Sequence, residues 1–201
     1  MGIRAFVFDC GGVVLRNGDL SAYTLWGERL GLAPDELRRR LWTGEPWVSA
    51  ERGQISDAEF WRRIGAVFGL GAPEQVATLR EDLWGTWVVD EQVLALVDRL
   101  RSKYRVALLS NASDALEDIL RERFGIADRF DPLLSSARLG LAKPDRAIYE
   151  ELLKRLQLEP HEVVYIDDAA ENIAAAAGLG LHVVWFVNAA ELERQLEPYL
   201  R

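Results

Sequence analysis

Apolar and polar positions follow two patterns along the chain, and the pattern changes near residues 16 and 87. At the start and in the second half, short apolar runs that end in polar residues alternate with stretches of helical spacing. The runs at 3–8, 105–109 and 163–166 have the length and continuity of strands buried in a parallel sheet. Residues 16–86 show helical spacing alone. The pattern predicts an α/β fold, a Rossmann-like doubly wound parallel sheet, with a helical bundle inserted after its first strand.

The inserted segment is expected to hold four short helices. Pro34 and Pro73 stand where two of them begin, and Ser56 and Glu59 form a capping box at the start of another. The first helix is expected to end near Leu30. Six of the seven tryptophans lie between residues 26 and 87, which also marks this segment as a separate unit. We therefore expect an α/β core domain from residues 1–15 and 87–201 and a helical cap domain from residues 16–86.

After residue 87, helices and strands alternate to the end of the chain. Asp90 is placed to cap a helix that ends near Leu100, and Gly125 is placed to end a helix that reaches about Phe124. The remaining expected elements are a strand near 130–134, a helix over 145–156, a helix ending near 177, a strand over 182–186 and a helix over 189–200.

Composition narrows the choice of partners. The chain has 201 residues, a net charge of −8 and one cysteine. The acidic excess argues against nucleic acid and anionic membranes as partners, and a single cysteine excludes an internal disulfide framework. No apolar run approaches the roughly 20 residues that span a bilayer, and no signal peptide is visible before the first strand. We therefore expect a cytoplasmic protein, either a monomer or a homodimer.

Three of the predicted strands end in polar residues, at Asp9, at Ser110-Asn111 and at Asp167-Asp168. The carboxyl ends of parallel strands meet at one edge of the sheet, where ligands bind in open α/β folds, and a loop with Lys143 can reach that edge. Clustered carboxylates repel each other unless a cation lies among them, and such oxygen ligands suit Mg²⁺. Ser110 and Lys143 can hold phosphate oxygens. The set predicts phosphoryl transfer with a carboxylate nucleophile.

Taken together and in this order, these motifs carry a resemblance to a known family. The chain resembles the haloacid dehalogenase (HAD) superfamily, in its phosphatase branch, through Asp9-Cys10-Gly11-Gly12-Val13, Ser110-Asn111, Lys143-Pro144-Asp145 and Asp167-Asp168 with Asn172. The helical insert is similar to the family's C1-type cap. Within the family, the chain resembles bacterial sugar-phosphate (glucose-1-phosphate) phosphatases and the N-terminal phosphatase domain of soluble epoxide hydrolases. The resemblance implies an enzyme that uses Mg²⁺ to hydrolyse small phosphorylated metabolites, sugar phosphates above all.

The resemblance also implies a role for each matching residue. Asp9 corresponds to the nucleophile that forms an aspartyl-phosphate, and Ser110 and Lys143 correspond to the pair that binds phosphate. Asn111 would help to hold the substrate. The implied Mg²⁺ ligands are Asp9, the backbone carbonyl of Gly11, Asp167 and Asp168, with Asn172 supporting them from behind.

Gly11 departs from the family pattern. Most phosphatases of the family carry an aspartate at this position, which protonates the leaving oxygen and then activates water. Acid–base assistance of this kind is worth roughly 10²–10⁴-fold in rate. We therefore expect either a substrate with a good leaving group, such as an anomeric sugar phosphate, or an acid from the cap, for which Asp19 and Glu45 are the candidates.

Two other functions remain open at this point. A 2-haloacid dehalogenase also uses an aspartate nucleophile but needs no metal, so the pair Asp167-Asp168 argues against it. A non-catalytic module that binds a phosphate ligand is motivated by Gly11, although the intact nucleophile and metal carboxylates argue against it. Of the other prominent residues, Cys10 is expected to be buried and Arg38–Arg40 to face solvent. Most tryptophans of the insert are expected to pack inside the bundle, and Trp42 and Trp47 are the candidates for lining a substrate pocket.

Overall fold

Five parallel strands form the central sheet of the computed structural model, which describes residues 2–200. Their order is β5 (Leu133–Ser135), β4 (Arg105–Ser110), β1 (Ala5–Phe8), β6 (Val163–Asp167) and β7 (His182–Trp185). Phe8, the last residue of β1, pairs with Leu108 of β4 and with Ile166 of β6. The residues that follow these three strands therefore meet at one edge of the sheet. The predicted fold class is confirmed.

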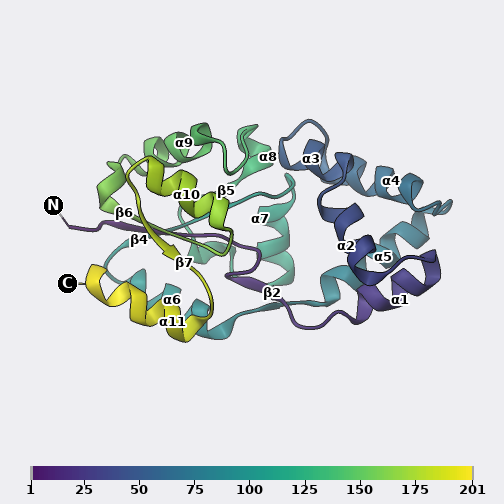
Figure 1. The fold of residues 1–201 in the computed structure, drawn as a ribbon, viewed down its shortest axis with the longest axis horizontal. Helices are drawn as coiled ribbons and strands as arrows, with labels where there is room; N and C mark the ends of the chain where they lie inside the picture. Colours follow the sequence, from purple (N-terminus) through teal and green to yellow (C-terminus); the bar gives the residue numbers. More distant parts are fainter. Residues whose placement is uncertain (1, 201) are drawn as a thin grey trace.

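Helices cover both faces of this sheet. Figure 1 shows α9 and α10 on one face and α6 and α11 on the other. These helices are α6 (Glu91–Leu100), α9 (Arg146–Leu156), α10 (Ala170–Gly178) and α11 (Ala189–Leu196). The shorter elements are α7 (Leu116–Asp118), continued by a π-helical turn (Ile119–Arg123), α8 (Ser136–Leu139), and 3₁₀ turns at Ala127–Arg129, Pro160–Glu162 and Glu197–Tyr199. The last helix stops before its predicted end because Pro198 cannot continue the hydrogen-bond ladder.

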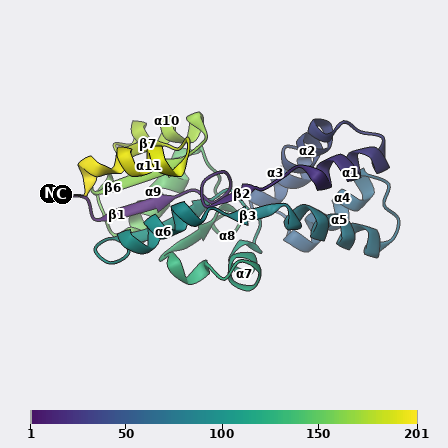
Figure 2. The ribbon, with the colours of Figure 1, turned by 90° about the horizontal axis from the view of Figure 1, so that it is seen from below.

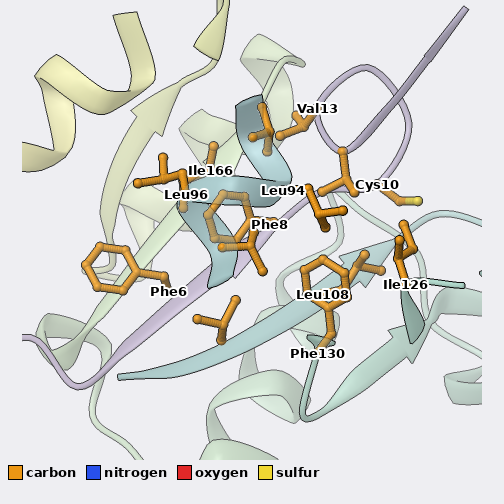
Figure 3. Packing of buried hydrophobic residues seen from close by; sticks show 14 of the residues in the cluster. Phe6, Phe8, Cys10, Val13, Leu94, Leu96, Leu108, Ile126, Phe130 and Ile166 are labelled. Atoms are coloured by element: carbon orange, nitrogen blue, oxygen red, sulfur yellow. The ribbon is translucent and has the colours of Figure 1, made fainter. Parts of the chain in front are cut away.

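Alternate side chains of β1 pack on opposite faces of the sheet. Phe6 and Phe8 join the apolar cluster under α6 and α11, whereas Ala5 and Val7 join the cluster under α9 and α10. Figure 3 shows Phe8 packed close to Leu108. All four side chains of β1 are fully buried. Burying a large apolar side chain contributes about 1.5–3 kcal/mol, so this strand fixes the position of the aspartate that follows it.

Within residues 16–86, five helices form the inserted bundle. They are α1 (Ser21–Leu30), α2 (Pro34–Trp42), α3 (Glu45–Glu51), α4 (Asp57–Val67) and α5 (Pro73–Gly85). The additional helix is α3, which is not among the four helices that the sequence predicts. Pro46 stands in its first turn, a position that favours proline because the missing N–H has no helical partner there. At the start of α4, the hydroxyl of Ser56 accepts a hydrogen bond from the N–H of Glu59 (3.2 Å), which is one half of the predicted capping box. The carboxylate of Glu59 accepts instead from Arg62 and Arg63.

Two short strands join the helical bundle to the core, as Figure 2 shows. β2 (Leu15–Asn17) and β3 (Trp87–Val89) pair antiparallel at the expected domain boundaries. Strands of three residues are too short to show alternation, so the sequence pattern does not reveal them. Among residues 2–200, none of the helices combines the length and apolar character needed to cross a bilayer.

Candidate active site

A buried lysine bridges two buried aspartates at the edge of the sheet. Nζ of Lys143 lies 2.8 Å from Oδ1 of Asp9 and 2.8 Å from Oδ2 of Asp167. Asp9 follows β1, Asp167 ends β6, and Lys143 lies on the loop before α9. Burying each charge costs free energy, which the opposite charges in direct contact offset. The backbone N–H of Cys10, itself buried as predicted, also donates to Oδ1 of Asp9 (2.7 Å).

Burial and the neighbouring charges shift the pKa values of Asp9 and Lys143. Burial raises the pKa of Asp9, Lys143 lowers it and Asp167 raises it, with the result that this pKa stands at about 6. Burial lowers the pKa of Lys143, but the two carboxylates outweigh burial and raise this pKa above its usual value. Lys143 therefore stays charged throughout the neutral range, and Asp9 ionises within reach of neutral pH.

Asp167 accepts hydrogen bonds at both of its carboxylate oxygens. Oδ1 accepts from the backbone N–H of Ala169 (2.8 Å) and from Nδ2 of Asn172 (3.1 Å). Oδ2 accepts from Lys143, from Nδ2 of Asn172 (3.0 Å) and from the hydroxyl of Tyr165. Tyr165 is a partner that the sequence does not reveal, because within β6 its position is that of an ordinary core residue. The arrangement holds Asp167, and through it Lys143, in one orientation.

Asp168 is the more exposed of the two adjacent aspartates, and its carboxylate faces the glycine loop after Asp9. Gly12 has φ of +90°, and a Cβ at this position would lie 2.7 Å from Cγ of Asp168. Carboxylate oxygens of Asp9, Asp167 and Asp168 lie within 4.8 Å of one another. An all-oxygen donor set with several carboxylates is what Mg²⁺ prefers, so these residues fit a magnesium ion.

The polar residues at the end of β4 lie at the same edge of the sheet as Asp9 and Asp167. Ser110 is buried at the last position of the strand. Asn111 uses its side chain to hold the lysine loop, because Nδ2 donates to the backbone carbonyl of Lys143 (2.9 Å) and Oδ1 accepts from the N–H of Lys143 (2.8 Å). Asn111 is expected from the sequence to contact substrate, and both polar groups of its side chain are engaged by Lys143.

A cavity extends from this edge of the sheet toward the helical bundle. On the core side, it is lined by Cys10, Gly11, Gly12, Ser110, Asn111 and Asp168. Trp42 and Trp47, the two candidates from the sequence, line it from the bundle together with Phe60 and Trp61. Arg38 is exposed, as expected, and also lines the cavity. The polar residues of the sheet edge and the aromatic residues of the bundle thus share one cavity.

The structure does not bring the two candidate cap acids to this cavity. Asp19 is exposed and accepts a hydrogen bond from the N–H of Ser21 (2.8 Å), and Glu45 is exposed and accepts one from Ser49 (2.9 Å). Within residues 2–200, neither Asp19 nor Glu45 is among the residues that line the cavity. A Cβ at Gly11 would lie 3.8 Å from the ring of Trp87. An indole therefore stands beside the position at which the family carries its acid.

The chain thus combines a parallel sheet covered by helices, a buried ion pair between Asp9 and Lys143 at one edge of that sheet, and an inserted helical bundle. A family model described as haloacid dehalogenase-like hydrolase matches residues 3–180, and the chain belongs to this family.

Three similar proteins extend this assignment. The chain is 28% identical over 179 residues to a sesquiterpene phosphatase of Aspergillus oryzae. The aligned region covers 89% of this chain and 87% of that protein. It is 28% identical over 214 residues to the D-ribitol-5-phosphate phosphatase of Bacteroides thetaiotaomicron, covering 98% of each. A crystal structure of a HAD family enzyme from the same bacterium, a mutant in complex with magnesium and inorganic phosphate, matches with a TM-score of 0.76 at 25% identity. That match covers 92% of this chain and 94% of the other. The chain is a phosphatase of the HAD family.

Proposed function

We propose that this phosphatase uses Mg²⁺ to hydrolyse small phosphomonoesters through an aspartyl-phosphate on Asp9. The observation that carries the proposal is the buried ammonium of Lys143, 2.8 Å from Asp9 and held by Asp167. It supplies a fixed positive charge beside the proposed nucleophile, where negative charge develops on the transferring group. Sugar phosphates are the substrates that the sequence favours, and the relative named for D-ribitol 5-phosphate supports a phosphorylated polyol.

The proposed reaction proceeds in two steps. Oδ1 of Asp9 accepts hydrogen bonds from Cys10 and Lys143, so we assign the attack to Oδ2. A bond forms between Oδ2 and phosphorus while the bond from phosphorus to the alcohol oxygen breaks, and the leaving oxygen takes a proton from water because Gly11 carries no acid. Water then cleaves the aspartyl-phosphate, which releases inorganic phosphate and restores the carboxylate. Lys143 and the hydroxyl of Ser110 stabilise the phosphoryl oxygens in both steps.

The proposed metal ligands are Asp9, Asp168 and the backbone carbonyl of Gly11. Mg²⁺ held there would supply positive charge to the phosphoryl oxygens. The sequence also assigns Asp167 to the metal. Because both oxygens of Asp167 already accept hydrogen bonds from protein groups, we propose instead that it positions Lys143, and that Asn172 supports it.

The test is phosphate release from a panel of phosphomonoesters, measured with Mg²⁺ and with EDTA. We expect Mg²⁺-dependent release that is lost in Asp9→Asn and kept in Asp128→Asn, which removes an exposed carboxylate outside the cavity. The absence of release from every ester would overturn the proposal. Turnover of 2-haloacids would then support a dehalogenase, and binding of Mg²⁺ and phosphate without turnover would support a binding module.

A further inference from the structure

Much of the lining of the cavity is aromatic. We call this surface the aromatic wall, and it consists of Trp42, Trp47, Phe60, Trp61, Trp84 and Trp87. Several of its rings pack edge to face: the centroids of Trp42 and Trp47 lie 4.9 Å apart, and those of Phe60 and Trp61 lie 5.0 Å apart. Aromatic pairs of this geometry attract each other beyond the burial of their surface. The aromatic wall is therefore a preformed apolar surface contributed by α2, α3, α4, α5 and β3.

The indole N–H groups of the aromatic wall offer few hydrogen bonds to a ligand. Nε1 of Trp42 donates to the hydroxyl of Tyr23 (3.0 Å). The Nε1 atoms of Trp61 and Trp84 are buried within the described part of the chain, so a ligand in the cavity cannot reach them without rearrangement. The aromatic wall thus presents mainly ring faces and edges.

Two of the charged side chains that line the cavity already have partners. Asp57 accepts a hydrogen bond from Ser113 (2.8 Å), and Arg16 forms an ion pair with Asp90 (3.3 Å). A sugar hydroxyl that packs against the aromatic wall gives up water without gaining a hydrogen bond there, which weakens binding on the order of tenfold for each hydroxyl.

The surroundings of Gly11 also favour an aromatic alcohol as the leaving group. The ring of Trp87, and no carboxylate, lies beside Gly11, 3.8 Å from where a Cβ would stand. An alcohol oxygen that leaves without an acid leaves fastest when its anion is stable, as in a phenol, whose pKa is about 10. Aromatic alcohols therefore suit both the missing acid and the aromatic wall.

We infer that this cavity takes phosphate monoesters of bulky apolar alcohols, with the alcohol packed against the aromatic wall. This inference rests on the proposed phosphatase function and names a substrate class other than the sugar phosphates that the sequence favours. The phosphate lies at the polar edge of the sheet, and the alcohol is recognised by its apolar surface.

The experiment compares cyclohexylmethyl phosphate with glucose 6-phosphate. Both carry the phosphate on a primary carbon attached to a ring, so their leaving oxygens are alike, and they differ in the ring oxygen and the hydroxyls. Acetyl phosphate is included because its leaving group is too small to cover the aromatic wall. We expect kcat/KM for cyclohexylmethyl phosphate to exceed that for glucose 6-phosphate by at least about tenfold.

Variants of the aromatic wall sharpen the test through the ratio of these two kcat/KM values, which does not depend on the fraction of folded enzyme. Trp47→Ala is expected to lower the ratio about tenfold. Trp87→Ala repeats the test at a residue of β3, which joins the helical bundle to the core and lies outside the packing of the bundle. Leu25→Ala, an exposed residue of α1 outside the cavity, is the control and keeps the wild-type ratio.

The outcomes separate this inference from the function on which it rests. Mg²⁺-dependent turnover with glucose 6-phosphate equal to or better than cyclohexylmethyl phosphate would overturn the apolar substrate class and leave the phosphatase standing. A ratio that Trp47→Ala and Trp87→Ala do not change would also overturn it. If neither ester nor acetyl phosphate is hydrolysed, the proposed function itself fails, and this inference fails with it.

Discussion

Replacing Gly12 with alanine is expected to displace the carboxylate of Asp168. Gly12 has φ of +90°, where an added side chain costs about 1–2 kcal/mol. The new Cβ would lie 2.7 Å from Cγ and 3.1 Å from Oδ1 of Asp168, whereas carbon atoms pack favourably at about 3.5–4.0 Å. Asp168 must therefore shift by about 1 Å, and a displacement of that size costs about 10²-fold in rate. We expect kcat/KM to fall by about this factor and the Mg²⁺ concentration for half-maximal activity to rise.

The assay is phosphate release as a function of Mg²⁺ concentration, together with urea unfolding. Gly11→Ala is the matched comparison, because its Cβ would meet only the ring of Trp87 at 3.8 Å, an ordinary contact, and the backbone carbonyl is kept. Its loss should be far smaller than that of Gly12→Ala. Wild-type Mg²⁺ dependence in Gly12→Ala, or equal losses in the two variants, would refute the placement of Asp168 against this loop.

Three further predictions follow from the same contacts. Lys143→Met leaves two buried carboxylates without their cation, so it should abolish turnover and lower the free energy of unfolding by about 3–5 kcal/mol; urea unfolding at wild-type denaturant concentrations would contradict this. Because folding raises the pKa of Asp9 from 3.8 to about 6, the folded state binds this proton more tightly than the unfolded chain does. The metal-free protein should therefore lose up to about 3 kcal/mol of stability as pH rises from about 4 to about 6, and Asp9→Asn should remove that dependence in urea titrations with EDTA. Ser113→Ala removes the donor to buried Asp57 and should cost about 1–3 kcal/mol by urea unfolding, so an unchanged midpoint and slope would count against that contact.

The fold could be predicted where a pattern is long enough to have a period. The unbroken apolar run of β1 needs burial on two faces, and a parallel sheet with helices on both faces is the arrangement that provides it. α3 and the pair β2–β3 were beyond this reasoning. One spans seven residues and the others three each, so local spacing cannot distinguish them from turns, and their formation depends on contacts with distant residues.

Topology predicts that the site residues lie close together. The sequence does not predict which of Asp167 and Asp168 contacts Lys143. Parallel strands bring their carboxyl ends to one edge whatever the details of packing, which places Asp9 and the two aspartates together. Neighbouring residues at a strand end point to opposite sides, and here Asp167 is fully buried against Lys143 while Asp168 faces Gly12. Which of the pair points inward depends on the neighbours of β6, which the sequence does not display.

The contacts between the helical bundle and the core are placed so that recognition of the alcohol and positioning of the phosphate are coupled. Arg52, just after α3, pairs with Asp145 (3.0 Å), two residues beyond Lys143, but this exposed ion pair contributes only about 0–1 kcal/mol. The hydrogen bond from Ser113 to Asp57 joins the start of α4 to the loop that follows Ser110, and it is the stronger anchor because both side chains are largely buried. The same bundle carries most of the aromatic wall. A shift of the bundle would therefore also act on the loop after Ser110 and on the loop of Lys143. The fit of the alcohol against the aromatic wall would in this way affect the geometry of the phosphate site.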